Sequence, residues 1–127
     1  MDHIRILLVD DQRSVRKGLL MRLSLEPDIE VVGEAADGKE AVSIATDLHP
    51  DVLVMDYEMP NMDGVEATRA ITAAGLDSRV VMLSIYDNVA VKKAAADAGV
   101  RAFVCKQDPS EILLAAIREA VSDVEPL

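Results

Sequence analysis

Cysteine and tryptophan are almost missing from this sequence, whose 127 residues include one cysteine, Cys105, and no tryptophan. A single cysteine excludes a disulfide bond within the chain and is typical of a protein from a reducing compartment. The absence of tryptophan removes the residue best suited to stack on a flavin ring. We therefore expect a cytoplasmic protein, and a flavin carrier becomes a weak hypothesis.

Basic residues and long apolar runs are also scarce. The 13 lysines and arginines are outnumbered by 23 aspartates and glutamates, which gives a formal net charge of −10. Such a surface repels phosphate backbones, so we expect no direct contact with nucleic acid. No apolar run approaches the length of a membrane-spanning helix, and the start MDHIRILLVDD reaches a charged pair too early for a signal peptide. We expect no membrane association.

The residues that are present suit one domain with a substantial core, because half of them are hydrophobic. Five runs rich in valine and leucine are nearly continuously apolar. This pattern is typical of strands buried on both faces, as in a parallel sheet. The predicted strands are residues 4–10, 29–35, 51–56, 79–84 and 101–106.

The segments between these runs have helical spacing. Apolar residues recur at intervals of three and four in residues 15–23, 41–48 and 113–120. Gly75 and Gly99 follow helical runs at positions suited to a C-terminal cap. Strands that alternate with helices predict a doubly wound α/β fold, with a five-stranded parallel sheet and helices on both faces.

Several aspartates after strands are explained as helix caps. In a capping box, an aspartate and a glutamate three residues later cap the helix start reciprocally. Three pairs have this spacing: Asp37 with Glu40, Asp63 with Glu66, and Asp108 with Glu111. Asp10, Asp11 and Asp56 lack the acidic partner, so the capping explanation fits them poorly.

These three aspartates belong to a set of polar residues at the predicted strand ends. The set is Asp10, Asp11, Asp56, Ser84 and Lys106. Parallel strands bring their carboxyl ends to one edge, where ligands of open α/β sheets bind. Three crowded carboxylates repel one another unless one is protonated or a cation binds, and oxygen ligands indicate a hard ion: Mg²⁺, or alternatively Mn²⁺ or Ca²⁺. The metal, a lysine and a hydroxyl would hold a phosphoryl group, with Asp56 as the nucleophile.

The motifs LLVDD (7–11), VMDYEMPNMDG (54–64), MLS (82–84) and FVCK (103–106) resemble those of bacterial response regulator receiver domains. The resemblance covers nearly the whole chain. It implies the flavodoxin-like strand order 2-1-3-4-5. It also implies that Asp56 accepts a phosphoryl group from the phosphohistidine of a cognate histidine kinase. Such a domain is no conventional enzyme, because it catalyses only its own phosphorylation and dephosphorylation.

The resemblance also implies a role for each matching residue. Asp11 would bind Mg²⁺ directly and Asp10 largely through water, with the Glu58 backbone carbonyl completing the metal site. Ser84 and Lys106 would bind the phosphoryl oxygens. Phe103 has the position of the family's aromatic switch, which acts together with Ser84.

Two further residues are candidates for the mouth of the pocket. Glu58 and Tyr86 each lie two residues beyond a position that would contact the phosphoryl group. We expect the bulk of Tyr86 to obstruct an attacking water. Gln107 replaces the proline that follows the lysine in many receivers, and the sequence leaves the cis or trans state of the Lys106–Gln107 bond open.

Within receivers, the run from QRSVRKGL to DIEVVGEAADGKEAV resembles the NarL/FixJ subfamily, whose members usually have a C-terminal helix-turn-helix. We therefore predict a receiver domain in residues 1–122 and the start of a linker or tail in residues 123–127. Phosphorylation would change dimerisation or an output domain for transcription regulation. The main alternative is a stand-alone receiver that acts in a phosphorelay or by protein docking.

Three other functions fit the sequence less well. A haloacid-dehalogenase-type phosphohydrolase would have its nucleophile after the first strand and a second aspartate two residues on, whereas Gln12 and Arg13 follow the acidic pair. A flavodoxin-like carrier needs a phosphate loop rich in serine, threonine and glycine, which VDDQRS is not. A degenerate receiver used as a scaffold would lack reactive side chains, and none is missing here.

Overall fold

The structure is a computed structural model that describes residues 3–85 and 88–122. Five strands alternate with five helices along this part of the chain. The predicted linker or tail in residues 123–127 lies outside the described residues. The elements are β1 (Ile4–Val9), α1 (Arg13–Leu23), β2 (Ile29–Ala35), α2 (Gly38–Leu48), β3 (Val52–Asp56), α3 (Gly64–Ala73), β4 (Arg79–Ser84), α4 (Val89–Ala98), β5 (Ala102–Cys105) and α5 (Ser110–Ser122).

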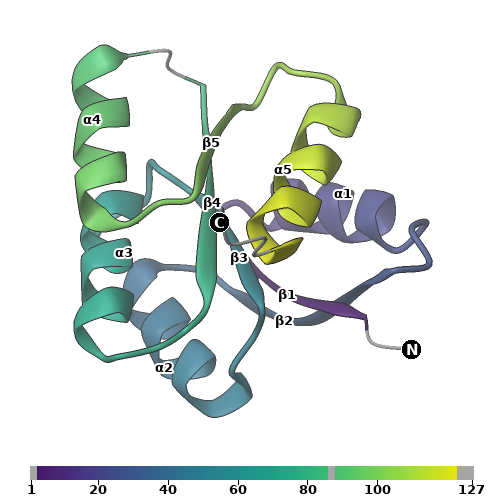
Figure 1. Ribbon diagram of the computed structural model, residues 1–127, viewed down its shortest axis with the longest axis horizontal. Helices are drawn as coiled ribbons and strands as arrows, with labels where there is room; N and C mark the ends of the chain where they lie inside the picture. The colour runs from purple at the N-terminus through teal and green to yellow at the C-terminus, as the bar shows by residue number, and fades with distance from the viewer. Residues whose placement is uncertain (1–2, 86–87, 123–127) are drawn as a thin grey trace, which may run out of the picture.

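The strands form one parallel sheet in the order β2-β1-β3-β4-β5, which confirms the predicted fold class and strand order. In Figure 1, α1 and α5 cover one face of the sheet, and α2, α3 and α4 cover the other. The chain leaves β1 for β2 on one side and returns to β3 on the other. The crevice at this reversal lies between β1 and β3, as expected for a doubly wound sheet.

Both faces of the sheet are buried, as the continuous apolar runs predict. Alternate residues of one strand enter different cores: Ile6 and Leu8 pack on the α1 and α5 side, whereas Leu7 and Val9 pack on the α2 and α3 side. A third cluster lies under α4 and includes Met82 from β4. The sheet is thus fixed from two directions, which holds its strand ends in place.

Three strands are shorter than predicted. Asp10, Asp51 and Lys106 lie just outside β1, β3 and β5, and Arg101 precedes β5. Local hydrogen bonds explain two of these boundaries. The Asp51 carboxylate accepts a hydrogen bond from the Arg5 N–H at 2.8 Å, and the Asp10 carboxylate accepts one from the Gln12 N–H at 2.8 Å. Asp10 follows the end of β1 and Asp51 precedes the start of β3, where such side chains compete with the strand ladder for backbone hydrogen bonds.

The helix starts follow the capping prediction in part. Asp63 and Glu66 form the complete capping box of α3. Asp37 accepts from the Glu40 N–H, but the Glu40 side chain accepts from the Ala36 N–H, so the α2 box is not reciprocal. The prediction for Asp108 is wrong: α5 begins at Ser110, and no described donor bonds to the Asp108 side chain. Pro109 therefore precedes the first helical residue instead of occupying that position.

Left-handed residues lie at or just after the ends of α2, α3 and α4. Gly99 is the C-cap of α4 with φ 106°, and Gly75 follows α3 with φ 75°. His49 caps α2 with φ 49°, a role that the sequence did not indicate. The described peptide bonds are all trans, including Lys106–Gln107. In the described segments, no helix combines the length and the apolar composition needed to cross a membrane.

Candidate functional site

The structure brings Asp10, Asp11 and Asp56 together at the carboxyl edge of the sheet. Asp56 is the last residue of β3, and the other two directly follow β1. Carboxylate oxygens of all three lie within 4.8 Å of one another. Asp10 and Asp56 are buried, with 1% and 6% of their surface exposed, whereas Asp11 is exposed. Two buried carboxylates thus meet a third that remains open to solvent.

Lys106 supplies the positive charge at this edge. Its Nζ lies 3.1 Å from an Asp56 oxygen and 3.3 Å from an Asp10 oxygen. The Lys106 N–H donates to the Ser84 carbonyl at 2.8 Å, which continues the β4–β5 ladder beyond the end of β5. The backbone therefore fixes the direction from which the ammonium approaches.

The backbone around Asp56 is held by close contacts. The Tyr57 N–H donates to the Leu83 carbonyl at 2.8 Å, and the Gly64 N–H donates to the Tyr57 carbonyl at 2.8 Å. A Cβ at Gly64 would lie 2.7 Å from the Asp56 carbonyl oxygen and 3.0 Å from the Tyr57 Cα. Glycine is needed at this position because α3 begins directly against the end of β3.

Burial raises the pKa of the Asp56 carboxyl, and the nearby charge of Asp10 raises it further. Lys106 and a backbone hydrogen bond from Glu58 oppose this shift without cancelling it. For Lys106, burial lowers the pKa, but its contacts with Asp56 and Asp10 outweigh the burial, and the pKa is raised. The Lys106 side chain is therefore protonated and positively charged beside the carboxylates.

Ser84 and Phe103 lie on the neighbouring strands. Ser84 ends β4 and is buried, with 1% of its surface exposed. Phe103 pairs with Met82 in the sheet and packs partly buried against the cluster under α4. The Lys92 ammonium lies 5.8 Å from the centre of the Phe103 ring. Ser84 thus lies at the carboxyl edge, and Phe103 lies two residues before the end of β5.

An open acidic hollow of about 430 Å³ lies beside the carboxylates. It is lined by Asp11, Tyr57, Glu58, Met59, Pro60 and Asp63. Glu58 is exposed there, as expected for a residue at the mouth of the site. Tyr86, the other residue predicted at the mouth, lies outside the described residues.

Two residues near Asp10 were missed by the sequence analysis. The Arg16 guanidinium donates to the Asp10 carbonyl and forms an ion pair with Glu34 at 3.1 Å. The Gln12 N–H holds one oxygen of the Asp10 carboxylate. The position of Arg16 one turn into the helix after the acidic pair was an available signal, because an α1 side chain there points back toward its N-terminus.

The carboxylate cluster suits a hard divalent cation. Its ligands are all oxygens, and their close spacing lets a single small ion contact them after minor adjustment. Burial and the neighbouring Asp10 raise the pKa of Asp56, and a bound cation would favour the charged form of this carboxyl. The fold and this edge together define a doubly wound α/β protein with a cluster of three carboxylates beside a lysine.

Comparison with known families identifies the class of this protein. The sequence model of one protein family, the response regulator receiver domain, matches residues 6–118, and the chain belongs to that family. It is therefore a phosphoacceptor signalling domain and no conventional enzyme. It is similar to the transcriptional regulatory protein LiaR of Bacillus subtilis (strain 168), with 41% identity over 97% of this chain and 58% of LiaR.

Further relatives agree with this assignment. The response regulator protein VraR of Staphylococcus aureus is 41% identical over 91% of this chain and 56% of its own length. The signal receiver domain of the putative response regulator NarL from Mycobacterium tuberculosis matches with a TM-score of 0.90 and 33% identity, over 96% of this chain and 99% of that domain. The chain spans a little over half the length of these two curated relatives.

Proposed function

We propose that Asp56 is the phosphoacceptor, with Mg²⁺ held by Asp10, Asp11, Asp56 and the Glu58 backbone carbonyl. The observation that carries the proposal is the buried Asp56 carboxylate, which ends its strand 3.1 Å from the Lys106 ammonium and beside two further carboxylates. A carboxylate that serves only as a helix cap is usually exposed and has no such neighbours.

In the proposed reaction, an Asp56 oxygen attacks the phosphorus of a kinase phosphohistidine. The new bond joins this oxygen to phosphorus, and the bond between phosphorus and the imidazole nitrogen breaks. Its electron pair passes to the nitrogen, which takes a proton. Lys106 and the Ser84 hydroxyl donate to the phosphoryl oxygens and so stabilise the charge that develops there, and the lysine already lies beside Asp56. Bound Mg²⁺ would neutralise part of the remaining negative charge.

The test of this proposal is phosphoryl labelling of the wild-type protein. Incubation with a small acyl phosphate and Mg²⁺ should add one phosphoryl group, because the donor replaces the kinase while the protein supplies the reactive carboxylate. Intact-mass measurement immediately after mixing gives the extent of labelling. A matched sample with excess chelator should remain unlabelled, and full labelling in that sample would contradict the metal requirement.

The phosphoryl group would also operate a switch. A phosphoryl oxygen draws the Ser84 hydroxyl inward and vacates space that Phe103 fills, which favours one of two existing packings. Glu58 and Tyr86 at the mouth would set how long the phosphoryl group survives. These roles follow the family resemblance, and the pairing of β4 with β5 places Ser84 and Phe103 on neighbouring strands.

Ser84→Ala should separate phosphorylation from switching. The variant keeps Asp56 and Lys106 and should still be labelled, but it lacks the hydroxyl that follows the phosphoryl group. Amide chemical-shift changes on phosphorylation, in β5 and the flanking helices, should fall to about half of the wild-type values or less. Ser78→Ala is the matched control, because Ser78 bonds to the Pro50 carbonyl at the opposite end of β4. Equal shift changes in the Ser84 and Ser78 variants would refute the coupling.

The output of the switch is proposed to be transcription regulation. The similarity to LiaR and VraR supports this, as both are longer than the present chain. A histidine kinase would be the phosphoryl donor in the cytoplasm, and phosphorylation would change homodimerisation or release a DNA-binding domain. The acidic charge favours DNA contacts by a different domain. The stand-alone receiver that acts in a phosphorelay or by docking is the second candidate.

A further inference from the structure

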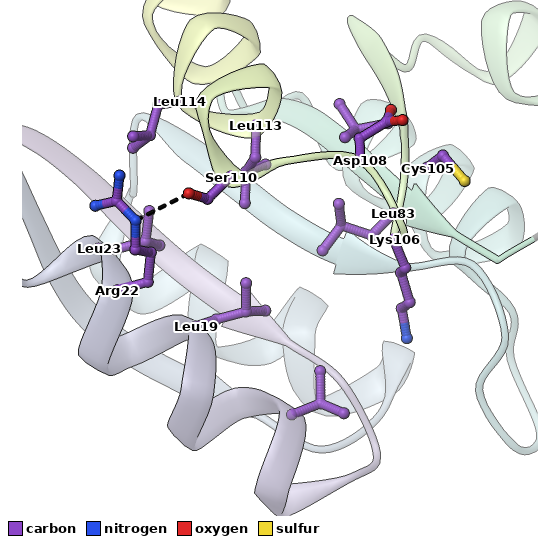
Figure 2. Close-up of a pocket in the computed structure, with 12 residues that line it drawn as sticks. Leu19, Arg22, Leu23, Leu83, Cys105, Lys106, Asp108, Ser110, Leu113 and Leu114 are labelled. Atoms are coloured by element: carbon purple, nitrogen blue, oxygen red, sulfur yellow. Dashed lines mark hydrogen bonds between the residues drawn. The ribbon is translucent and has the colours of Figure 1, made fainter.

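A cavity of about 390 Å³ lies between α1 and α5, on the face of the sheet away from α2, α3 and α4. Helix α1 packs on β1 and β2, whereas α5 packs on β3, β4 and β5, so the two helices cover different parts of the sheet. The apolar wall includes Val15, Leu19, Leu23, Leu83, Leu113 and Leu114. In Figure 2, leucines from α1, α5 and the sheet surround this space.

Polar contacts join the two helices beside the cavity. Arg22 of α1 donates from Nε to the Ser110 hydroxyl of α5 at 2.9 Å, the bond drawn across the gap in Figure 2. Arg22 also pairs with Glu26 at 2.9 Å, and Arg118 of α5 pairs with the same glutamate at 2.8 Å. The guanidinium in the cavity wall is therefore already neutralised by a carboxylate.

The other charged residues of the wall are also satisfied without an occupant. Lys106 lines the cavity with its side chain while its ammonium pairs with Asp10 and Asp56. Asp108 is exposed, so water solvates its carboxylate. A charged occupant would need to break an existing ion pair or lose its own hydration in an apolar space.

We propose that this cavity is a binding site for a small, uncharged, largely apolar molecule of one or two rings. Its volume lies within the range of small-molecule pockets, and its walls combine apolar side chains with a few fixed polar groups, as such pockets do. Burial of an apolar ring against the leucines of both helices supplies the affinity. The Ser110 hydroxyl, which keeps a proton to donate, provides one hydrogen bond that orients the occupant.

The site is distinct from the acidic hollow but shares a residue with the phosphoryl site. Lys106 belongs to both, and Leu83 in the cavity wall directly precedes Ser84. An occupant therefore contacts the backbone segments that position two of the residues proposed to bind the phosphoryl group. The binding itself does not depend on the proposed function and is tested without phosphorylation.

The experiment is a titration of the protein with indole, a neutral two-ring probe, followed by amide chemical shifts. Saturable shifts should cluster at Leu19, Leu23, Ser110 and Leu113. Leu19→Phe fills the cavity and should weaken indole binding by about tenfold or more, whereas Met21→Phe should leave it unchanged, because Met21 is 65% exposed on the same helix and outside the wall. If the urea midpoint of the Leu19→Phe variant falls so far that the variant is no longer folded, Val15→Met, at another wall position, takes its place.

Charged analogues test the chemical class. Tryptamine and indole-3-acetate have the same ring with opposite charges, and both should bind more weakly than indole. Tighter binding of either one would overturn the assignment to an uncharged ligand. Shifts that do not saturate, or binding that persists unchanged in a folded cavity-filling variant, would overturn the site. Shifts of the same residues with protein concentration alone, in probe-free samples, would show a second copy as the occupant and would also overturn it.

Discussion

Asp56→Asn should abolish phosphoryl labelling completely and, in the same protein, raise the stability of the metal-free fold. Asparagine has nearly the shape of aspartate, but its amide oxygen is not a nucleophile that forms a stable phosphoryl bond. Labelling by a small acyl phosphate with Mg²⁺, measured by intact mass, should fall from one phosphoryl group to none. Full labelling of the Asp56→Asn variant would show that another residue is the phosphoacceptor.

The stability of the Asp56→Asn variant shows whether labelling is lost because the nucleophile is missing or because the protein has unfolded. The pKa of Asp56 is raised by burial and by Asp10, so between the ordinary aspartate pKa and this raised value the native state binds more protons than the unfolded state. The wild-type protein therefore loses stability as the pH rises through this window. Asparagine carries no such charge, so the gain in the free energy of unfolding should be largest near neutral pH and should shrink as the pH falls below the window.

Asp63→Asn is the matched control for this prediction. Asp63 lies in the same segment and accepts the Glu66 N–H as the N-cap of α3, a role that asparagine fills equally well. This variant should be labelled like the wild-type protein. Urea titrations at several pH values in excess chelator give the stabilities. A stability gain of the Asp56→Asn variant that is absent, or that grows toward acid pH, would contradict the electrostatic explanation.

Gly64→Ala should destabilise the fold by about 1–3 kcal/mol, although alanine is the better helix former. The new Cβ would lie 2.7 Å from the Asp56 carbonyl oxygen and 3.0 Å from the Met82 side chain. The first of these neighbours is backbone that the buried strand β3 holds in place, so it cannot move away without disturbing the sheet. Urea denaturation should show a lower midpoint with an unchanged slope.

Gly18→Ala provides a control with the opposite sign. Gly18 lies within α1, and an added Cβ would meet nothing within 4 Å. The same substitution should therefore stabilise the protein by about 0.5–1 kcal/mol, through helix propensity alone. If Gly64→Ala were as stable as Gly18→Ala, the close approach of α3 to the end of β3 would not be a constraint on the fold.

The apolar pattern was sufficient to predict the five strands and their burial on both faces. It works here because residues such as Leu7 and Leu8 point to opposite faces and both need apolar surroundings. Strand boundaries were less accurate, because Asp10 after β1 and Asp51 before β3 form side-chain bonds to the backbone. Such bonds depend on partners distant in sequence, or on local geometry that an apolar pattern does not encode.

The candidate site was predictable because each of its residues ends a strand or follows one. Once the sheet is parallel, its topology alone brings Asp10, Asp56 and Lys106 to one edge. The support from Gly64 and Arg16 was not predicted, since both depend on how closely α3 and α1 approach the strand ends. The cavity between α1 and α5 was also not predictable, because periodicity gives the face that a helix buries but not the gap between two helices.

The contact between Lys106 and Asp10 joins residues 96 positions apart in the chain. During synthesis from the N-terminus, the three carboxylates leave the ribosome well before the lysine that compensates them. A nascent chain that ends before β5 therefore has no complete phosphoryl site, whatever local structure it has formed. Under the proposed function, phosphoryl acceptance would therefore be restricted to chains whose last strand has joined the sheet.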